Sequence, residues 1–357
     1  MTIYQLMQPL RLESGQILDS VDIAYQITGT PNEDGSNVVV ICHTLTGGID
    51  IASSRTWWFV GPDQLIDTNH SCVISMATLG SWHGSSSPSN QGVPPRQKAR
   101  LQFPTVTVTD SINAHRQLLR SLGIVRARAL IGGSFGGFCA YTWLTLEPEL
   151  FDVAFIFQSA LRCSAHTIAF FALARELICA DPTWSNGNYR DQDIINMPGV
   201  KRMVALNRLL QFSHATLESK FPPDERYPQQ AQQISFADPW SPVDTFVLGE
   251  PKSVQGLDPA DFLCLIRSSA LFDLYRSFPD LWNRWKKLRT QTVQIPCVQD
   301  WRYPVEGMEV IHQQMLQLGL ESHLLVSESA FGHGSFLHDP ASLQPFLPFL
   351  RRILKAT

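Results

Sequence analysis

The sequence ALIGGSFGGF (residues 129–138) places one serine, Ser134, among four glycines at the end of an apolar run. Residues 132–136 match the pattern Gly-x-Ser-x-Gly, which is typical of a sharp turn from a strand into a helix. Small neighbours suit such a turn because larger side chains would collide with the crowded backbone. Residues 126–131 before it read as a strand, and residues 138–146 after it read as a helix. We therefore interpret Ser134 as a nucleophile, against the alternative of a small residue in a tight turn.

Short β-branched runs on both sides of this turn alternate with a helical segment, which indicates an α/β fold. The runs that read as buried strands are 38–41, 72–76, 127–131 and 153–157. A helix is predicted between the second and the third run, with Asp110 as its N-cap and Gly123 as its end. Strands that alternate with helices predict a mostly parallel sheet flanked by helices.

Beyond about residue 164 the pattern changes to long helical stretches, such as residues 200–221. Alternation of strand and helix returns near residue 291. We therefore expect one α/β core with a helical insertion that covers it as a lid. The core is assigned to residues 1–164 and 292–357, and the lid to residues 165–291.

A serine hydroxyl needs a histidine base to act as a nucleophile, and His333 is the best of the ten histidines for that role. It lies in the segment FGHGSF, where glycines on both sides suit a loop that presents an imidazole at the edge of a sheet. His43 and His83 lie in loops and remain alternatives. His115 and His312 lie on predicted helices, so they read as structural residues.

The histidine in turn needs a carboxylate that orients it. Asp300 closely follows the strand candidate TVQIPCV and precedes His333 by 33 residues. Asp273 and Asp280 fall in the helical insertion and are less well placed. The resulting order of Ser134, Asp300 and His333 along the chain is the order expected of an α/β-hydrolase fold.

The oxygen that becomes negative in an acyl-transfer reaction needs two backbone N–H groups, which together form an oxyanion hole. Phe135, the residue after the serine, is expected to supply one of them. The segment CHTLTGG (residues 42–48) follows the first strand candidate and is expected to supply the other, from Leu45 or Thr46.

The composition excludes several other classes of protein. The net charge is −4, the pI is about 6.2 and the basic residues are scattered, so neither nucleic acid nor a membrane surface is expected as a partner. No signal peptide or long apolar span is recognisable, and we expect a cytoplasmic protein. The seven cysteines are widely spaced and form no CxxC motif, so neither a disulfide framework nor a metal site is indicated.

These motifs, in this order, resemble the homoserine O-acetyltransferase family of α/β-hydrolase-fold acyltransferases, which includes related serine and deacetylcephalosporin acyltransferases. CHTLTGG is similar to the family's HALTG, and LIGGSFGGFCAYTW matches its serine turn. QDWRYP looks like the SDWLYP segment that carries the acid, and FGHGSFLHDP resembles the GHDAFL segment that carries the histidine. The likeness covers nearly the whole chain and supports Ser134, Asp300 and His333 as a catalytic triad.

The resemblance implies that an acyl-CoA, as co-substrate and without a further cofactor, acylates Ser134 and that a small hydroxylated acceptor then takes the acyl group. Family members commonly form homodimers through the lid, which is an expectation here as well. An arginine of the family's lid binds the acceptor carboxylate, and Arg202 aligns with it approximately. The family's aspartate that follows the catalytic histidine is replaced by Gly334, and a lost charge-assisted contact is worth about 1.5–3 kcal/mol. The acceptor is therefore left open between homoserine and another small hydroxylated molecule.

The same triad also suits a different class of reaction. An esterase or thioesterase would let water reach the acyl-enzyme, and this hydrolase is the main alternative to the transferase. A scaffold without catalytic activity is a further alternative, but it would show a broken triad, and Ser134, Asp300 and His333 are all present.

Overall fold

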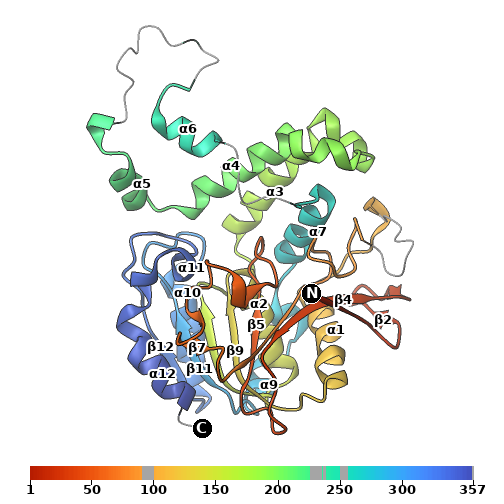
Figure 1. Cartoon of the computed structure of the whole chain (residues 1–357), viewed down its shortest axis with the longest axis vertical. Helices are drawn as coiled ribbons and strands as arrows, with labels where there is room; N and C mark the ends of the chain where they lie inside the picture. Colours follow the sequence, from red (N-terminus) through yellow and green to blue (C-terminus); the bar gives the residue numbers. More distant parts are fainter. Residues whose placement is uncertain (91–99, 226–234, 236–238, 250–255, 356–357) are drawn as a thin grey trace.

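The computed structural model describes residues 1–90, 100–225, 235, 239–249 and 256–355 (Figure 1). Its centre is an eight-stranded sheet in the order β1-β4-β8-β5-β9-β10-β11-β12. In that order the strands are Thr2–Gln5, Asp22–Thr28, Cys72–Met76, Val38–Cys42, Ala127–Gly133, Phe151–Phe157, Gln291–Ile295 and Ser322–Leu324. Only the pairs β1–β4 and β4–β8 of this sheet are antiparallel. The predicted fold class, a mostly parallel sheet flanked by helices in an α/β-hydrolase fold, is confirmed.

Both faces of the sheet are covered, which explains why its strands read as continuous apolar runs. Val38 and Val40 of β5 belong to the core cluster on the side of α1 and α2. Val39 and Ile41 point the other way and pack in the cluster that includes α12. The helices of this core are α1 (Val108–Ser121), α2 (Phe135–Leu146), α8 (Leu274–Ser277), α9 (Leu281–Trp285), α10 (Val305–Gln317), α11 (Ser335–His338) and α12 (Leu347–Lys355).

Helix α1 begins earlier than the sequence pattern indicated, and our assignment of Asp110 as its N-cap is wrong. The N-cap is Thr107, whose hydroxyl accepts a hydrogen bond from the Asp110 amide at 3.1 Å. The Asp110 carboxylate in return accepts from the Thr107 amide at 2.9 Å. This reciprocal capping box needs a hydroxyl three residues before an acidic side chain, and the spacing of Thr107 and Asp110 provides it.

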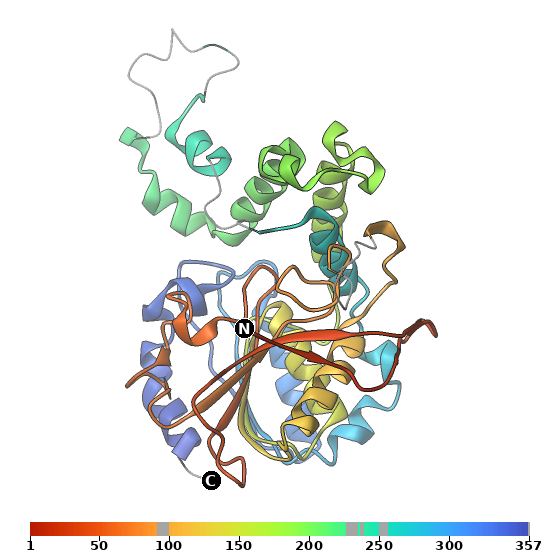
Figure 2. The same ribbon diagram turned by 45° about the vertical axis from the view of Figure 1, so that its right-hand side comes forward.

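The lid, defined here as helices α3 to α7, lies above one end of the sheet (Figure 1; Figure 2). Its helices are α3 (Ala165–Cys179), α4 (Pro198–Gln211), α5 (His214–Lys220), α6 (Pro242–Leu248) and α7 (Pro259–Ala270). The end of the segment assigned to the lid from its sequence lies in the core instead. Trp285 of α9 stacks on Tyr141 of α2 and donates a hydrogen bond from its indole to Thr145 at 3.0 Å.

The helical stretch expected over residues 200–221 is divided into α4 and α5. The break falls at Phe212 and Ser213, where the chain pairs with the loop that carries His333. The Ser213 amide donates to the carbonyl of Phe331 at 2.9 Å, and its hydroxyl caps α5 by accepting from the Thr216 amide. The lid is therefore attached to the histidine loop at this break.

Among the residues that the structure describes, no helix has the length and apolar character needed to cross a bilayer.

Candidate active site

Ser134 lies at the turn between β9 and α2, as its glycine-rich surroundings predicted. Its φ of 55° and ψ of −121° are a strained conformation for a residue with a side chain. The turn leaves no room for larger neighbours, because a Cβ at Gly132 would lie 2.1 Å from the Gly136 carbonyl oxygen. A Cβ at Gly136 would lie 2.4 Å from the Cys42 oxygen. The glycines therefore allow the strand, the turn and the neighbouring loop to approach one another closely.

His333 lies between Ser134 and Asp300 in one continuous line of hydrogen bonds. Its Nδ1 is 2.8 Å from the Asp300 carboxylate, and its Nε2 is 2.9 Å from the Ser134 hydroxyl. An ionised carboxylate can only accept, so Nδ1 carries the proton and Nε2 accepts from the serine hydroxyl. All three side chains are buried. The arrangement has the geometry needed to draw a proton from the serine.

Asp300 is itself held in place by the loop that follows β11. One carboxylate oxygen faces His333, while the other accepts hydrogen bonds from the amides of Arg302 and Tyr303 at 2.9 and 3.1 Å. The Tyr303 ring also lies 5.3 Å from the imidazole of His333. The carboxylate can therefore neither rotate nor exchange its histidine partner without losing two backbone contacts.

Gln158 fixes the backbone on both sides of His333, and the sequence analysis did not identify it. Its side-chain amide donates to the Gly332 carbonyl at 3.0 Å and accepts from the Gly334 amide at 2.9 Å. Gly332 and Gly334 have φ values of 103° and 83°, which favour glycine. The only signal available from sequence is a polar residue directly after the buried strand β10.

Two loops present free backbone amides next to Ser134. Within the described residues, the amides of Leu45 and Phe135 donate no hydrogen bond to the protein. Phe135 is the first residue of α2, where amides point away from the helix, and Leu45 and Thr46 both line the cavity above Ser134. The predicted oxyanion donors are therefore available for a ligand, and Thr46 remains an alternative to Leu45.

The other histidines have different surroundings. His43 is fully engaged, because its Nδ1 donates to the Thr44 carbonyl at 2.8 Å and its Nε2 accepts from the Thr78 amide at 3.1 Å. Burial lowers the pKa of His43 and lowers that of His83 to about 3. Neither nitrogen of His43 is free to serve Ser134, so His43 supports the loop of residues 42–48 instead.

His115 and His312 hold structural contacts, as their helical positions indicated. The Nε2 of His115 is 3.0 Å from the Ala77 carbonyl oxygen. The Nδ1 of His312 is 2.9 Å from the Ser322 hydroxyl.

A small cavity of about 80 Å³ opens directly above Ser134, between the core and α4 of the lid. Its lining comprises Thr44, Leu45, Thr46, Ser134, Asn207, Gln211, Arg302, His333, Gly334, Phe336, Leu337 and His338. Asn207 and Gln211 come from the lid and were not identified from the sequence. No acidic side chain is among the lining residues that the structure describes, whereas one guanidinium is. The cavity therefore suits a small polar ligand that carries no positive charge.

Arg202 does not reach this cavity, and the structure does not support its predicted role in acceptor binding. It is exposed on α4, five residues before the lining residue Asn207. At 3.6 residues per turn, that separation turns the two side chains roughly 140° apart around the helix. The arginine that lines the cavity is Arg302, which comes from the core.

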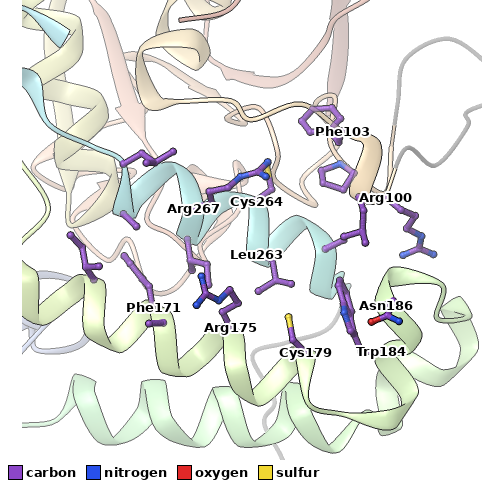
Figure 3. Close-up of a pocket in the computed structure, with 18 residues that line it drawn as sticks. Arg100, Phe103, Phe171, Arg175, Cys179, Trp184, Asn186, Leu263, Cys264 and Arg267 are labelled. Carbon is purple, nitrogen blue, oxygen red and sulfur yellow. The ribbon is translucent and has the colours of Figure 1, made fainter. Parts of the chain in front are cut away.

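A larger cavity of about 520 Å³ lies elsewhere, between α3, α7 and residues 100–103 (Figure 3). Arg175 and Cys179 of α3 face Leu263 of α7 across it. Neither Ser134, Asp300 nor His333 contributes to its lining. The cavity is therefore separate from the hydrogen-bonded side chains at which a reaction could occur.

Comparison with known proteins points to one family. No family model matches the chain. The homoserine O-acetyltransferase of Geotalea daltonii is 31% identical over 357 residues, which cover 97% of this chain and 95% of the relative. That of Zymomonas mobilis is 31% identical over 347 residues, which cover 94% of this chain and 92% of the relative.

Solved structures share the fold. The homoserine O-acetyltransferase of Bacillus anthracis superposes with a TM-score of 0.86 at 21% identity, over 99% of this chain and 97% of the other. Esterase E22 superposes with a TM-score of 0.84 at 21% identity, over 99% and 100% of the two chains. A transferase and an esterase therefore match this chain about equally well in fold.

Proposed function

The chain belongs to the homoserine O-acetyltransferase family and is an acyltransferase, and from this premise we propose that it transfers an acyl group, in particular acetyl, from acyl-CoA to a small hydroxylated acceptor. The transfer passes through an ester on Ser134. The observation that carries the proposal is the line of hydrogen bonds from Ser134 through His333 to Asp300 beneath a small cavity.

In the first half-reaction, His333 Nε2 takes the serine proton while the serine oxygen attacks the thioester carbon. The amides of Phe135 and of Leu45 or Thr46 stabilise the negative oxygen that forms. The C–S bond then breaks, and the imidazolium returns its proton to the departing CoA sulfur. Asp300 stabilises the imidazolium and holds its tautomer without taking the proton.

In the second half-reaction, the acceptor hydroxyl enters the vacated space and gives its proton to His333. Its oxygen attacks the acyl-serine ester, and the serine oxygen leaves with that proton. Water would react in the same way, so the transferase needs water to be excluded while the acyl-enzyme exists. The lid residues Asn207 and Gln211 lie over the cavity and contribute to that exclusion.

Hydrolysis is the second candidate function. Esterase E22 superposes on 99% of this chain, so the fold is compatible with an enzyme that uses water as its acceptor. The esterase or thioesterase would use Ser134, Asp300 and His333 in the same roles and differ only in what reaches the acyl-serine.

Incubation of the purified protein with acetyl-CoA and a panel of hydroxy acids and hydroxy amino acids separates the two functions. For a transferase we expect an O-acetyl product whose amount equals the CoA released, measured by mass spectrometry and thiol titration. Release of CoA with an equal amount of acetate and no acetylated product would reject the transferase.

We also propose that the protein forms a homodimer through the lid and that it is located in the cytoplasm. Its structural support is a set of apolar side chains on the lid with more than a third of their surface exposed, namely Ile168 and Leu173 of α3 and Leu209 of α4. Burial of such side chains stabilises association. Light scattering of the purified protein should give twice the mass of 40.0 kDa, and a monomer would contradict the proposed dimer.

A further inference from the structure

Tyr303 is a buried tyrosine whose side chain has no role in the reaction described above. Its exposed fraction is 5%. The ring lies 5.3 Å from the imidazole of His333, and the hydroxyl interacts with the Ser134 side chain. Burial raises the pKa of Tyr303, so the hydroxyl stays protonated at neutral pH. The side chain of Tyr303 therefore lies against two of the three reactive residues without carrying a charge.

A hollow of about 890 Å³ lies next to Tyr303. It is lined by residues 159–165, which follow β10, and by the first turns of α10. Arg162, Tyr275 and Val310 line it and are exposed, so the hollow is open to solvent. A space of this volume admits many water molecules, since each takes up about 30 Å³ in the liquid.

A thin wall separates this hollow from the reactive serine. Ser134 and His333 line the small cavity and not the hollow, whereas Tyr303 lines the hollow and not the small cavity. Ser159, which also lines the hollow, donates from its hydroxyl to the Ser134 carbonyl at 2.9 Å. The Tyr303 ring is held in the wall by the edge-on packing of the Phe138 ring at 5.8 Å. The hollow thus ends one side chain away from the serine.

We propose that Tyr303 determines whether the acyl-enzyme reacts with an acceptor or with water, an inference that rests on the Ser134 ester proposed above. The ring keeps water in the hollow away from the ester carbon. A water molecule at that carbon would give a proton to His333 while its oxygen bonds to the carbon, and the serine oxygen would then leave with that proton. The products would be a free carboxylic acid and free Ser134, so the acyl group would be lost to the acceptor.

The lifetime of the acetyl-enzyme in the absence of an acceptor tests this barrier. Acetyl-CoA and, separately, 4-nitrophenyl acetate serve as acyl donors, and mass spectrometry follows the loss of acetyl from Ser134. Tyr303→Ala removes the ring and leaves a gap that is large enough for water, so hydrolysis should become faster on the order of 10-fold or more. Tyr303→Phe keeps the ring and loses only the hydroxyl, so hydrolysis should rise by no more than about 3-fold.

The partition between acceptor and water should change alike for acceptors of different charge, because Tyr303 acts on water. The probes are homoserine, 4-hydroxybutanoate, which lacks the ammonium, and 3-aminopropan-1-ol, which lacks the carboxylate. In Tyr303→Ala the ratio of acetate to O-acetyl product should rise by a similar factor with every probe that the wild-type enzyme acetylates. A change confined to one probe would mean that Tyr303 contacts the acceptor, and it would overturn the inference.

Two other residues of the hollow provide matched controls. Tyr275→Ala removes the same kind of side chain from an exposed position of the lining and should leave hydrolysis unchanged. Gly307 lies in the first turn of α10, where a Cβ would meet no atom within 4 Å, so Gly307→Trp has room to fill part of the hollow. Alone, Gly307→Trp should leave acylation and hydrolysis unchanged. Combined with Tyr303→Ala, it should reverse most of the increase in hydrolysis.

Loss of a buried ring also destabilises the fold, so circular dichroism and thermal melting are recorded for each variant. Tyr303→Leu keeps more of the wall and provides the test if the alanine variant does not fold. The leucine variant should hydrolyse the acetyl-enzyme at a rate between those of the phenylalanine variant and an open wall.

Four results would overturn the role of the Tyr303 ring. Tyr303→Ala and Tyr275→Ala could behave alike, Tyr303→Phe could accelerate hydrolysis as much as Tyr303→Ala, or the double variant could hydrolyse as fast as Tyr303→Ala. The fourth is that Gly307→Trp alone slows acylation by acetyl-CoA, which would make the hollow a path for substrate. If the wild-type enzyme forms an acetyl adduct with 4-nitrophenyl acetate but not with acetyl-CoA, the proposed donor is rejected, while the ester donor still decides on Tyr303.

Discussion

The α/β core and the lid position their functional residues in different ways. In the core, Ser134, Asp300 and His333 each follow a strand, so the parallel sheet brings them to one edge. In the lid, Asn207 and Gln211 reach the cavity only because α4 packs over that edge with one particular face. The core thus supplies reactive groups through local sequence motifs, whereas the lid shapes the substrate site through packing.

The two regions meet at contacts that involve the reactive loops themselves. The Ser213 amide donates to Phe331 at 2.9 Å, and the Thr216 hydroxyl donates to Ala330 at 2.7 Å, two and three residues from His333. A movement of the lid at this point would therefore be transmitted to the loop that carries the histidine.

Among these substitutions, replacement of Ser134 should cause the largest loss of activity. The loss should arise within the core alone. In Ser134→Ala we expect kcat for acyl transfer to fall by about 10⁴-fold or more, because the nucleophile is lost. Thermal stability should stay nearly unchanged, since the alanine keeps the backbone and the Cβ of the strained turn. A stopped-flow or single-turnover assay with mass spectrometry of the protein measures both steps. An acyl adduct that persists in the variant would exclude Ser134 as its site.

Asp261 lies at the contact between the lid and the core, and its contribution to the stability of the folded protein should depend on pH. Asp261 of α7 is fully buried and accepts hydrogen bonds from the Ser89 amide and the Ser87 hydroxyl at 2.8 and 3.1 Å. Burial, reinforced by the charge of Asp258, raises the pKa of Asp261 to about 7, above the value of about 3.9 in an unfolded chain. The folded protein therefore holds the proton more tightly, and its stability falls as the pH rises through this interval.

Urea unfolding at pH 5 and pH 8 measures this effect. Asp261 should make the free energy of unfolding lower at pH 8 than at pH 5 by up to about 3 kcal/mol, because about two pH units of this range lie below the pKa of about 7. Asp261→Asn should remove that contribution. The asparagine oxygen can still accept from the Ser89 amide, so the contact remains. An equal pH dependence in the two proteins would mean that Asp261 does not hold a proton.

Most strands and reactive residues of the core could be predicted from the sequence. Buried parallel strands are apolar on both faces, so four of them were predicted from continuous β-branched runs. The reactive residues followed from turn chemistry and from chain order. Asp110 was assigned wrongly because Thr107, the true cap, lies one turn earlier in a segment with little periodicity.

The sequence did not predict the residues of the site that are positioned by tertiary packing. Arg202 and Arg302 are both plausible anion-binding residues in a linear sequence, and only the orientation of α4 turns the first away from the cavity. Gln158 is a single polar residue whose partners lie 174 and 176 residues away in the chain. Nothing in its local sequence shows that it holds the histidine loop.

Gln158→Met tests whether that support matters within the core. The methionine has a similar length but leaves the Gly332 carbonyl and the Gly334 amide without their partner. We expect kcat to fall on the order of 10- to 100-fold, because the loop no longer fixes His333 within hydrogen-bonding reach of Ser134. The conservative Gln158→Glu should retain the contact to the Gly334 amide and lose less activity. A methionine variant with wild-type kcat would show that the glycines alone define the loop.

Gly334 lies where the histidine loop of the core meets the lid, and Gly334→Asp should have the smallest effect of these substitutions. The resemblance to the family places an aspartate here, and a Cβ at this position would lie 3.5 Å from His338 and 3.6 Å from the Gln211 amide nitrogen, which is ordinary contact. The φ of 83° costs an aspartate on the order of 1 kcal/mol of stability. In return the carboxylate gives an acceptor ammonium a charge partner, so kcat/KM for 3-aminopropan-1-ol should rise about 3- to 10-fold relative to 4-hydroxybutanoate.

Gly334→Asn imposes the same backbone strain without the charge and should leave that ratio unchanged. If both variants alter the ratio equally, backbone strain explains the change, and the missing carboxylate does not set the preference of the acceptor site.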